Sequence, residues 1–192
     1  MLILDKVIIR KLEVADQIYF AEATELLNRT QGRNLFDANY LDIKAKDQNS
    51  IVVAAFYENQ LVGVGVSEII NDLKFYIPFD SQITDELKNI KVGSLTTLAI
   101  LESHQGQGIG KKITKKRLEW LKEQGCKVIV GLSWVSGLKH TSDRVFEKMG
   151  FKAVKKIDKF FWESSIQKPF DCPGCLSAPC ACAGIMYRLD LK

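Results

Sequence analysis

The hydrophobic and polar residues follow two periods along the chain, one typical of strands and one typical of helices. Two apolar, β-branched runs, Ser50 to Tyr57 and Leu61 to Ile70, are separated only by Glu58, Asn59 and Gln60. This arrangement predicts an antiparallel hairpin. Similar runs predict strands at residues 6–12, 93–101, 126–134, 152–163 and 185–191, and residues 73–77 are expected to extend the hairpin.

The clearest helical pattern begins at Ile109. At about 100° per residue, one half of this segment is apolar and the other half carries lysines and glutamates. Arg117 is the one charged residue on the apolar half, and Gln124-Gly125 ends the helix. Apolar residues at helical spacing predict further helices at residues 16–28, 37–47 and 142–149, and a short polar helix or loop at 82–90.

The order of these elements predicts the fold class. Hairpin strands come first, followed by strand–helix–strand–helix–strand and a last strand. This order indicates an α/β (α+β) protein with a mixed central sheet and flanking helices. We expect one domain over residues 1–192, with residues 168–184 inserted as a small loop between the last two strands.

Composition and charge narrow the function classes. The chain is 46% hydrophobic and 26% charged, which excludes a disordered or collagen-like protein. Its formal net charge of +4 is a mild excess that argues against nucleic acid as the main partner and suits a small polyanionic ligand. We find neither a signal-peptide pattern nor a membrane-spanning run, so we expect no membrane partner and a cytoplasmic location with reduced thiols.

Four of the five cysteines fall in one short stretch, at Cys172, Cys175, Cys180 and Cys182, with the spacing C-x2-C-x4-C-x-C. Four thiolates form a common tetrahedral zinc site, and such a site leaves no open coordination position for catalysis. The sequence therefore predicts a structural zinc ion that fixes this loop. An iron–sulfur cluster, free thiols and disulfides remain alternatives. Cys126 is expected in the core.

A glycine-rich segment, with Gly106, Gly108 and Gly110, lies between a predicted strand and the helix at Ile109. Glycines allow the backbone to approach a ligand closely, and the first helical amides attract anions. The spacing excludes a Walker loop, and Lys111 stands where a dinucleotide-binding fingerprint needs glycine. A plain glycine-rich turn remains the alternative.

At this segment the chain resembles the GNAT superfamily of acyl-CoA N-acyltransferases. Residues 105–110, QGQGIG, match the family signature Gln/Arg-x-x-Gly-x-Gly, and residues 98–101 are similar to the strand that precedes it. Residues 144–151, RVFEKMGF, resemble the second family motif, a helix that ends in Tyr-Glu-Lys-x-Gly-Phe. The segment 9–12 with Asp16 is similar to the first family strand and helix. The resemblance covers about residues 6–165 and the last strand.

The resemblance implies N-acetyl transfer from acetyl-CoA to a primary amine, on a small molecule or a peptide, by direct attack in a ternary complex. Backbone at Leu98, Ala99 and Ile100 would pair with the pantetheine. The signature loop and the helix start would hold the pyrophosphate, through Gln105, Gly106, Gln107, Gly108, Ile109, Gly110 and Lys111. Lys112 could add positive charge.

Three departures from the family pattern affect the mechanism. Phe146 stands where the family often has the tyrosine that protonates the leaving thiolate, Lys139 aligns with a common asparagine, and Glu102 replaces a usual proline. Glu68 on the inner hairpin is the first candidate for the general base. Glu102 and His140 are alternatives, and His104 comes next.

Two other functions remain open at this point. The enzyme could transfer a longer acyl group. A protein of a different class would use the same scaffold without catalysis, as a CoA-binding or partner-binding module whose zinc loop contacts a protein or nucleic acid. A homodimer is also left open.

Overall fold

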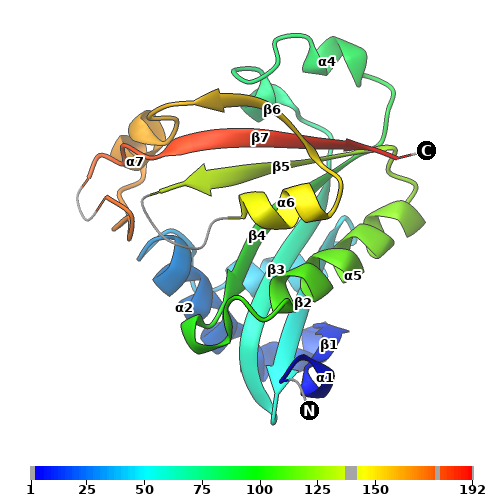
Figure 1. The fold of residues 1–192 in the computed structure, drawn as a ribbon, viewed down its shortest axis with the longest axis vertical. Helices are drawn as coiled ribbons and strands as arrows, with labels where there is room; N and C mark the ends of the chain where they lie inside the picture. Colours follow the sequence, from blue (N-terminus) through cyan, green and yellow to red (C-terminus); the bar gives the residue numbers. More distant parts are fainter. Residues whose placement is uncertain (1–2, 137–141, 176–177, 192) are drawn as a thin grey trace.

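The computed structural model describes residues 3–136, 142–175 and 178–191. Within these residues the strands form one seven-stranded sheet with the order β1-β2-β3-β4-β5-β7-β6 (Figure 1). The strands are β1 Ile8–Lys11, β2 Ser50–Tyr57, β3 Gln60–Ile70, β4 Val92–Ile100, β5 Val128–Val135, β6 Lys152–Ile157 and β7 Ala183–Asp190. Neighbouring strands are antiparallel except β4 and β5, which confirms the predicted mixed sheet.

Helices cover both faces of this sheet. They are α1 Ile3–Lys6, α2 Phe20–Gln31, α3 Tyr40–Lys46, α4 Ile83–Glu86, α5 Ile109–Glu123, α6 Asp143–Lys148 and α7 Trp162–Gln167, with 3-10 turns η1 Val14–Tyr19, η2 Lys74–Tyr76 and η3 Glu102–His104. None of the described helices combines the length and apolar composition needed to cross a membrane.

The two faces follow from strand alternation, because successive side chains point to opposite sides of a sheet. In β2, Val52 and Ala54 pack with the apolar residues of α2 and α3. Ile51 and Val53 pack instead with α5, through Ile109 and related residues. We call these the α2 face and the α5 face.

Two predicted strands were wrong in part. The run at 152–163 ends as a strand at Ile157, and residues Trp162–Gln167 form α7. Within residues 73–77, Lys74–Tyr76 form the 3-10 turn η2. Tyr76 is buried there, in one cluster with Leu73, Phe79 and residues of β4, β5 and β7. Predicted and observed bounds of the other strands agree to within about three residues.

The parallel strands β4 and β5 separate part-way along their length. They pair only from Val92 to Leu95 and from Val128 to Gly131, although both strands continue for several residues (Figure 1). The register between β3 and β4 also shifts at this point, which leaves Thr96 as the extra residue of a β-bulge. The sheet therefore opens beyond Leu95 and exposes an edge of β4.

Candidate functional site

The open edge of β4 presents the backbone of Leu98 and Ile100. The amide of Leu101 donates to the carbonyl of Val62 at 2.9 Å, so alternate residues of β4 turn their polar groups toward β3. By the same alternation, Leu98 and Ile100 turn theirs into the opening, whereas Ala99 faces β3. An extended ligand in the opening would pair with Leu98 and Ile100, and Ala99 would serve as the spacer between them.

Two glutamine side chains already contact this edge. Gln31, the last residue of α2, donates to the carbonyl of Leu98 at 3.1 Å and also to the hydroxyl of Thr97. Gln105 of the signature loop donates to the carbonyl of Ile100 at 2.9 Å. Side-chain amides therefore donate hydrogen bonds to this edge of β4 in the protein without ligand. The amide groups of a pantetheine could form hydrogen bonds of the same kind.

The glycine loop places a helix start at the end of the opening. Gly106 and Gly108 have φ of 75° and 86°, the left-handed region that favours glycine, and Gly108 is the N-cap of α5. The buried side chains of Ile109 and Ile113 fix α5 against the sheet. The first turn of α5 contains no acidic residue, so its amides can receive an anion.

The basic residues after the loop differ in their surroundings. Lys112 donates from Nζ to the carbonyl of Leu4 at 2.9 Å, which ties α5 to α1. Lys111 is exposed one residue earlier. Lys111 is thus better placed than Lys112 to neutralise a phosphate, and its role stays a prediction.

Glu68 lies at the bulge, on the α2 face of the sheet. Thr96 donates from Oγ1 to one carboxylate oxygen at 3.0 Å, and Lys44 of α3 donates from Nζ to the other at 2.5 Å. The carboxylate keeps 21% of its side-chain surface exposed. Of the base candidates named from the sequence, Glu68 is the one that the described structure places at the point where β4 and β5 separate.

Two tyrosines, Tyr40 and Tyr76, lie close enough to this carboxylate to feel its charge. Burial, and secondarily the negative charge of Glu68, raises the pKa of Tyr40 well above its ordinary value. Burial likewise raises the pKa of Tyr76, whose hydroxyl lies 3.0 Å from the hydroxyl oxygen of Ser94. Both phenols therefore stay neutral at physiological pH and can donate a hydrogen bond. The hydroxyl of Tyr40 has no partner among the described residues.

The other base candidates lie elsewhere. Glu102 is exposed at the start of η3, beyond the end of β4. The ring of His104 packs on Tyr57 at 5.5 Å between centroids, and its Nδ1 lies 2.9 Å from the hydroxyl of Ser103. His140 and Lys139 lie outside the described residues.

Phe146 is a core residue that lies over Gly131, in the last residue pair before β4 and β5 separate. Its ring stacks on Tyr187 with centroids 4.8 Å apart and an interplanar angle of 6°. A Cβ atom on Gly131 would lie 2.5 Å from its Cε1, so the ring fills the space above that glycine. The side chain is 5% exposed, so a hydroxyl group added to it would be placed in a packed region.

Arg117, the charged residue on the apolar half of α5, is 1% exposed. Its Nε donates to the hydroxyl of Ser67 at 2.8 Å, and a terminal nitrogen donates to the carbonyl of Val66 at 2.5 Å. Both partners flank the register shift between β3 and β4. Burial lowers the pKa of Arg117 to about 9, which still leaves the guanidinium charged at neutral pH. Arg117 thus provides donors where the bulge disturbs the ladder.

Sequence reasoning missed four residues at this site: Gln31, Tyr40, Lys44 and Thr96. Each reaches the site from another element, and no local motif marks them. Arg117 carried a usable signal, because a cation on an apolar helix face must find buried acceptors.

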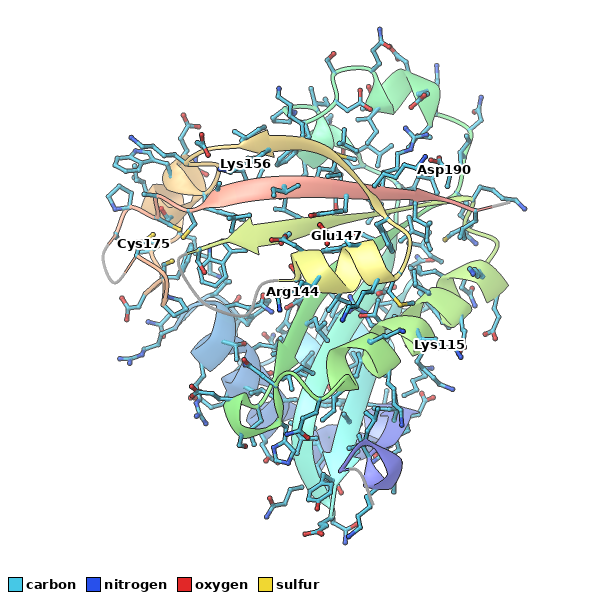
Figure 2. The ribbon with its side chains drawn as sticks, in the orientation of Figure 1. Lys115, Arg144, Glu147, Lys156, Cys175 and Asp190 are labelled. Carbon is cyan, nitrogen blue, oxygen red and sulfur yellow. The ribbon has the colours of Figure 1, made fainter. Side chains whose placement is uncertain are left out.

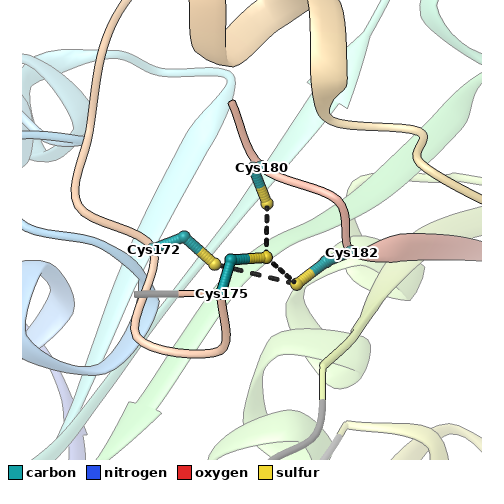
Figure 3. Close-up of side chains that lie close together, drawn as sticks. All are labelled: Cys172, Cys175, Cys180 and Cys182. Carbon is teal, nitrogen blue, oxygen red and sulfur yellow. Dashed lines mark hydrogen bonds between the residues drawn. The ribbon is translucent and has the colours of Figure 1, made fainter. Parts of the chain in front are cut away.

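The four clustered cysteines converge from both ends of the insert (Figure 3). The Sγ atoms of Cys172 and Cys182 are 3.7 Å apart, those of Cys175 and Cys180 are 3.8 Å apart, and those of Cys175 and Cys182 are 3.2 Å apart. All four sulfurs lie within 4.8 Å of one another, and none is in a disulfide. Cys126 is buried in the core as expected.

This spacing fits one metal ion. Tetrahedral zinc with bonds of about 2.3 Å requires sulfurs about 3.8 Å apart. An iron–sulfur cluster binds its thiolates to different irons, which spreads them more widely than a single ion does. The donor set and its spacing therefore favour a mononuclear four-thiolate centre.

The insert lies against the α2 face at the open end of the sheet. Phe170 and the cysteines pack with Leu35, with Trp134 near the end of β5, and with Phe161. Figure 2 shows Cys175 and Lys115 of α5 at opposite sides of the molecule. The insert therefore lies beside the segment that follows α2 and near the end of β5, away from Lys115 of α5.

Comparison with known proteins identifies the family. The sequence profile of the Acetyltransferase (GNAT) family matches residues 14–151. The chain belongs to the GNAT acetyltransferase family. A search of curated proteins finds no match.

Solved GNAT structures share the fold of this chain. The ribosomal-protein-S18-alanine N-acetyltransferase from Escherichia coli has 10% identity and a TM-score of 0.63, over 97% of this chain and 94% of that one. The NatC complex bound to Gag peptide and CoA has 13% identity and a TM-score of 0.67, over 97% and 99%. An N-acetyltransferase from Staphylococcus aureus Mu50 has 13% identity and a TM-score of 0.64, over 97% and 99%.

Proposed function

We propose that this GNAT protein transfers an acetyl group from acetyl-CoA to a primary amine, by direct attack in a ternary complex. The observation that carries the proposal is the opening between β4 and β5, which has the glycine loop at one end and Glu68 at the other. Family membership, and the CoA bound in the NatC structure, support the same co-substrate.

Each part of the opening has a role in this proposal. The amides of residues 107–111 receive the pyrophosphate, and the edge at Leu98 and Ile100 pairs with the pantetheine. The thioester then lies beside the bulge at Thr96, and backbone amides of the open edge polarise its carbonyl. The amine approaches from the α2 face.

Glu68 is the proposed general base. It accepts a proton from the ammonium, and the neutral nitrogen attacks the thioester carbon while the C–S bond breaks and the thiolate leaves. The nitrogen loses its second proton to solvent as the amide forms, and this proton balances the one that the thiolate takes up. Lys44 and Thr96 orient the carboxylate through their hydrogen bonds to its two oxygens. Phe146 cannot protonate the thiolate, so that proton comes from Tyr40, Tyr76 or solvent.

The four cysteines complete the proposal as a structural zinc site, because four thiolates saturate the ion and their spacing fits it. Such a site requires reduced thiols, which is consistent with a cytoplasmic location. Small-molecule amines and peptide amines both remain acceptors to test, since GNAT relatives include enzymes named for a ribosomal protein.

A panel of amines tests this function. We expect release of CoA and a mass increase of the amine by one acetyl group only when acetyl-CoA, amine and protein are all present. Binding of acetyl-CoA without turnover of any amine would instead support the second candidate, a non-catalytic CoA-binding or partner-binding module. The buried phenylalanine at position 146 is the observation that favours this alternative. Parallel reactions with longer acyl-CoA donors test the acyl preference.

A further inference from the structure

The connecting segment, residues 32–39 between α2 and α3, contacts both the cysteine insert and the candidate catalytic site. Arg33 and Asp171 exchange two backbone hydrogen bonds, of 3.2 Å and 3.1 Å. Lys168 donates from Nζ to the carbonyl of Leu35 at 3.2 Å and pairs with the carboxylate of Asp37 at 3.4 Å. The insert therefore holds this segment along most of its length.

Side-chain packing also joins the connecting segment to the cysteine insert. A Cβ atom on Gly32 would lie 2.5 Å from Cδ2 of Phe170, so the aromatic ring rests directly on this glycine. Gly32 has a φ of 150°, which a larger residue adopts only with strain. Leu35 packs within the cluster formed by Phe170 and the cysteines.

The residues that adjoin each end of the connecting segment contact the proposed site or its supporting side chains. At its start, Gln31 contacts the carbonyl of Leu98 on the open edge of β4. At its end, Phe36 packs on Tyr40 with ring centroids 4.8 Å apart, and Tyr40 begins the helix whose Lys44 pairs with Glu68. A displacement of residues 32–39 would therefore move groups on both sides of the thioester position.

The insert has little regular secondary structure to stabilise its conformation. Residues 168–182 contain no helix or strand in their described part. Their links to the rest of the chain include the hydrogen bond from the amide of Cys180 to the hydroxyl of Ser165, at 2.8 Å, and the close approach of Gly174 to Ser136. A metal ion bound by thiolates from both ends of such a loop contributes directly to its folding free energy.

We infer that one zinc ion, bound by Cys172, Cys175, Cys180 and Cys182, fixes the connecting segment and thereby sets the binding of the amine acceptor. The effect on acetyl-CoA binding is expected to be smaller. Gln31 contacts the pantetheine edge at the carbonyl of Leu98, whereas the glycine loop and α5, which would hold the pyrophosphate, pack on the α5 face of the sheet. The effect on acceptor binding rests on the proposed function. The binding of zinc and the fixation of residues 32–39 do not depend on it.

The first experiment measures the metal and the segment, without any assay of activity. Protein purified without chelators should contain close to one zinc per chain by mass spectrometry. Cys175→Ser should lose most of the zinc and increase amide hydrogen exchange in residues 32–37 by at least about tenfold. The matched control is Cys126→Ala, a buried cysteine outside the cluster, which should retain zinc and leave this exchange unchanged.

The second experiment measures function. After removal of zinc, the KM for the amine should rise by at least fivefold, while the dissociation constant for acetyl-CoA changes by less than about threefold. Where Cys175→Ser does not fold, wild-type protein treated with a chelator and then reloaded with zinc gives the same comparison. Reloading should restore both the KM and the slow exchange.

Several results would overturn the inference. Less than half an equivalent of metal, or iron in place of zinc, would contradict the metal assignment. Unchanged exchange at residues 32–37 in metal-free protein would contradict the fixed segment. Equal loss of amine and acetyl-CoA binding would show general unfolding instead. Failure to acetylate any amine would refute the proposed function and the acceptor part, but the metal and exchange results would still decide the rest.

Discussion

At the scale of single residues, the site depends on contacts that join distant parts of the sequence. Glu68 could be selected from the sequence because an acid on an otherwise apolar inner strand is unusual. Its partners Lys44 and Thr96 could not, because α3 and the bulge of β4 come together only through the tertiary fold. The sequence therefore indicated the carboxylate and left out the groups that orient it.

Replacing the proposed base tests the chemistry at this scale. Glu68→Gln keeps the size of the side chain but cannot accept the proton, so kcat/KM should fall by about 10²–10⁴. Glu119→Gln, an exposed acid of α5, is the matched control and should leave the rate unchanged. A loss of less than about threefold in Glu68→Gln would remove this residue from the mechanism.

Phe146 offers a second test. If the ring occupied the family position for protonating the thiolate, Phe146→Tyr would increase kcat. Because the ring is buried and packed above Gly131, we expect an added hydroxyl to cost about 1–3 kcal/mol of stability without an increase in kcat. Chemical denaturation and steady-state kinetics on the same samples distinguish these outcomes, and a faster enzyme of unchanged stability would contradict this placement.

At the scale of elements, α5 connects the glycine loop to the core. Its amphipathic pattern was predictable from the sequence because half of the helix is buried against β2 and β3. The helix α7 was not, because Phe160, Phe161 and Trp162 continue the apolar pattern of the preceding strand. The turn at Asp158 and Lys159, where Lys159 has a φ of 54°, breaks the strand without a glycine or proline to signal it.

Substituting the glycine at either end of α5 distinguishes an effect on ligand binding from an effect of backbone strain alone. Gly108→Ala places a side chain at φ of 86° beside the proposed pyrophosphate site, so the KM for acetyl-CoA should rise by roughly 5- to 30-fold. Gly125→Ala has a similar φ of 81° at the far end of the helix. It should show comparable destabilisation by thermal unfolding but an unchanged KM. Equal KM values in the two variants would place the pyrophosphate elsewhere.

Replacing the buried Arg117 should change the free energy of unfolding by an amount that does not depend on pH near neutrality. Because burial lowers its pKa to about 9, below its unfolded value, the folded state binds this proton less tightly, and stability should rise only as pH increases above about 9. Arg117→Ala should cost about 3–5 kcal/mol through a cavity and unpaired acceptors, and Arg117→Met should cost less. Urea unfolding at pH 6, 7 and 8 should give, for each variant, the same difference in free energy of unfolding from the wild type. A difference that varies across this range would contradict the account.

At the scale of the whole molecule, the order of helices and strands was enough to predict a mixed sheet with an insert before its last strand. It was not enough to predict that Arg33 and Asp171 would lie side by side, because a long-range backbone bridge has no local pattern. The place where β4 and β5 separate was equally hidden, since it depends on a register shift between β3 and β4 rather than on residue type. The functional opening is thus a product of the assembled sheet.

A crystal structure of the protein with acetyl-CoA tests the central claim most directly. We predict the pyrophosphate on the amides of residues 107–111, the pantetheine along the open edge of β4, and the thioester within one water molecule of the Glu68 carboxylate. Pantetheine bound outside this opening, or a thioester beside Glu102 with Glu68 remote from it, would contradict the proposed site.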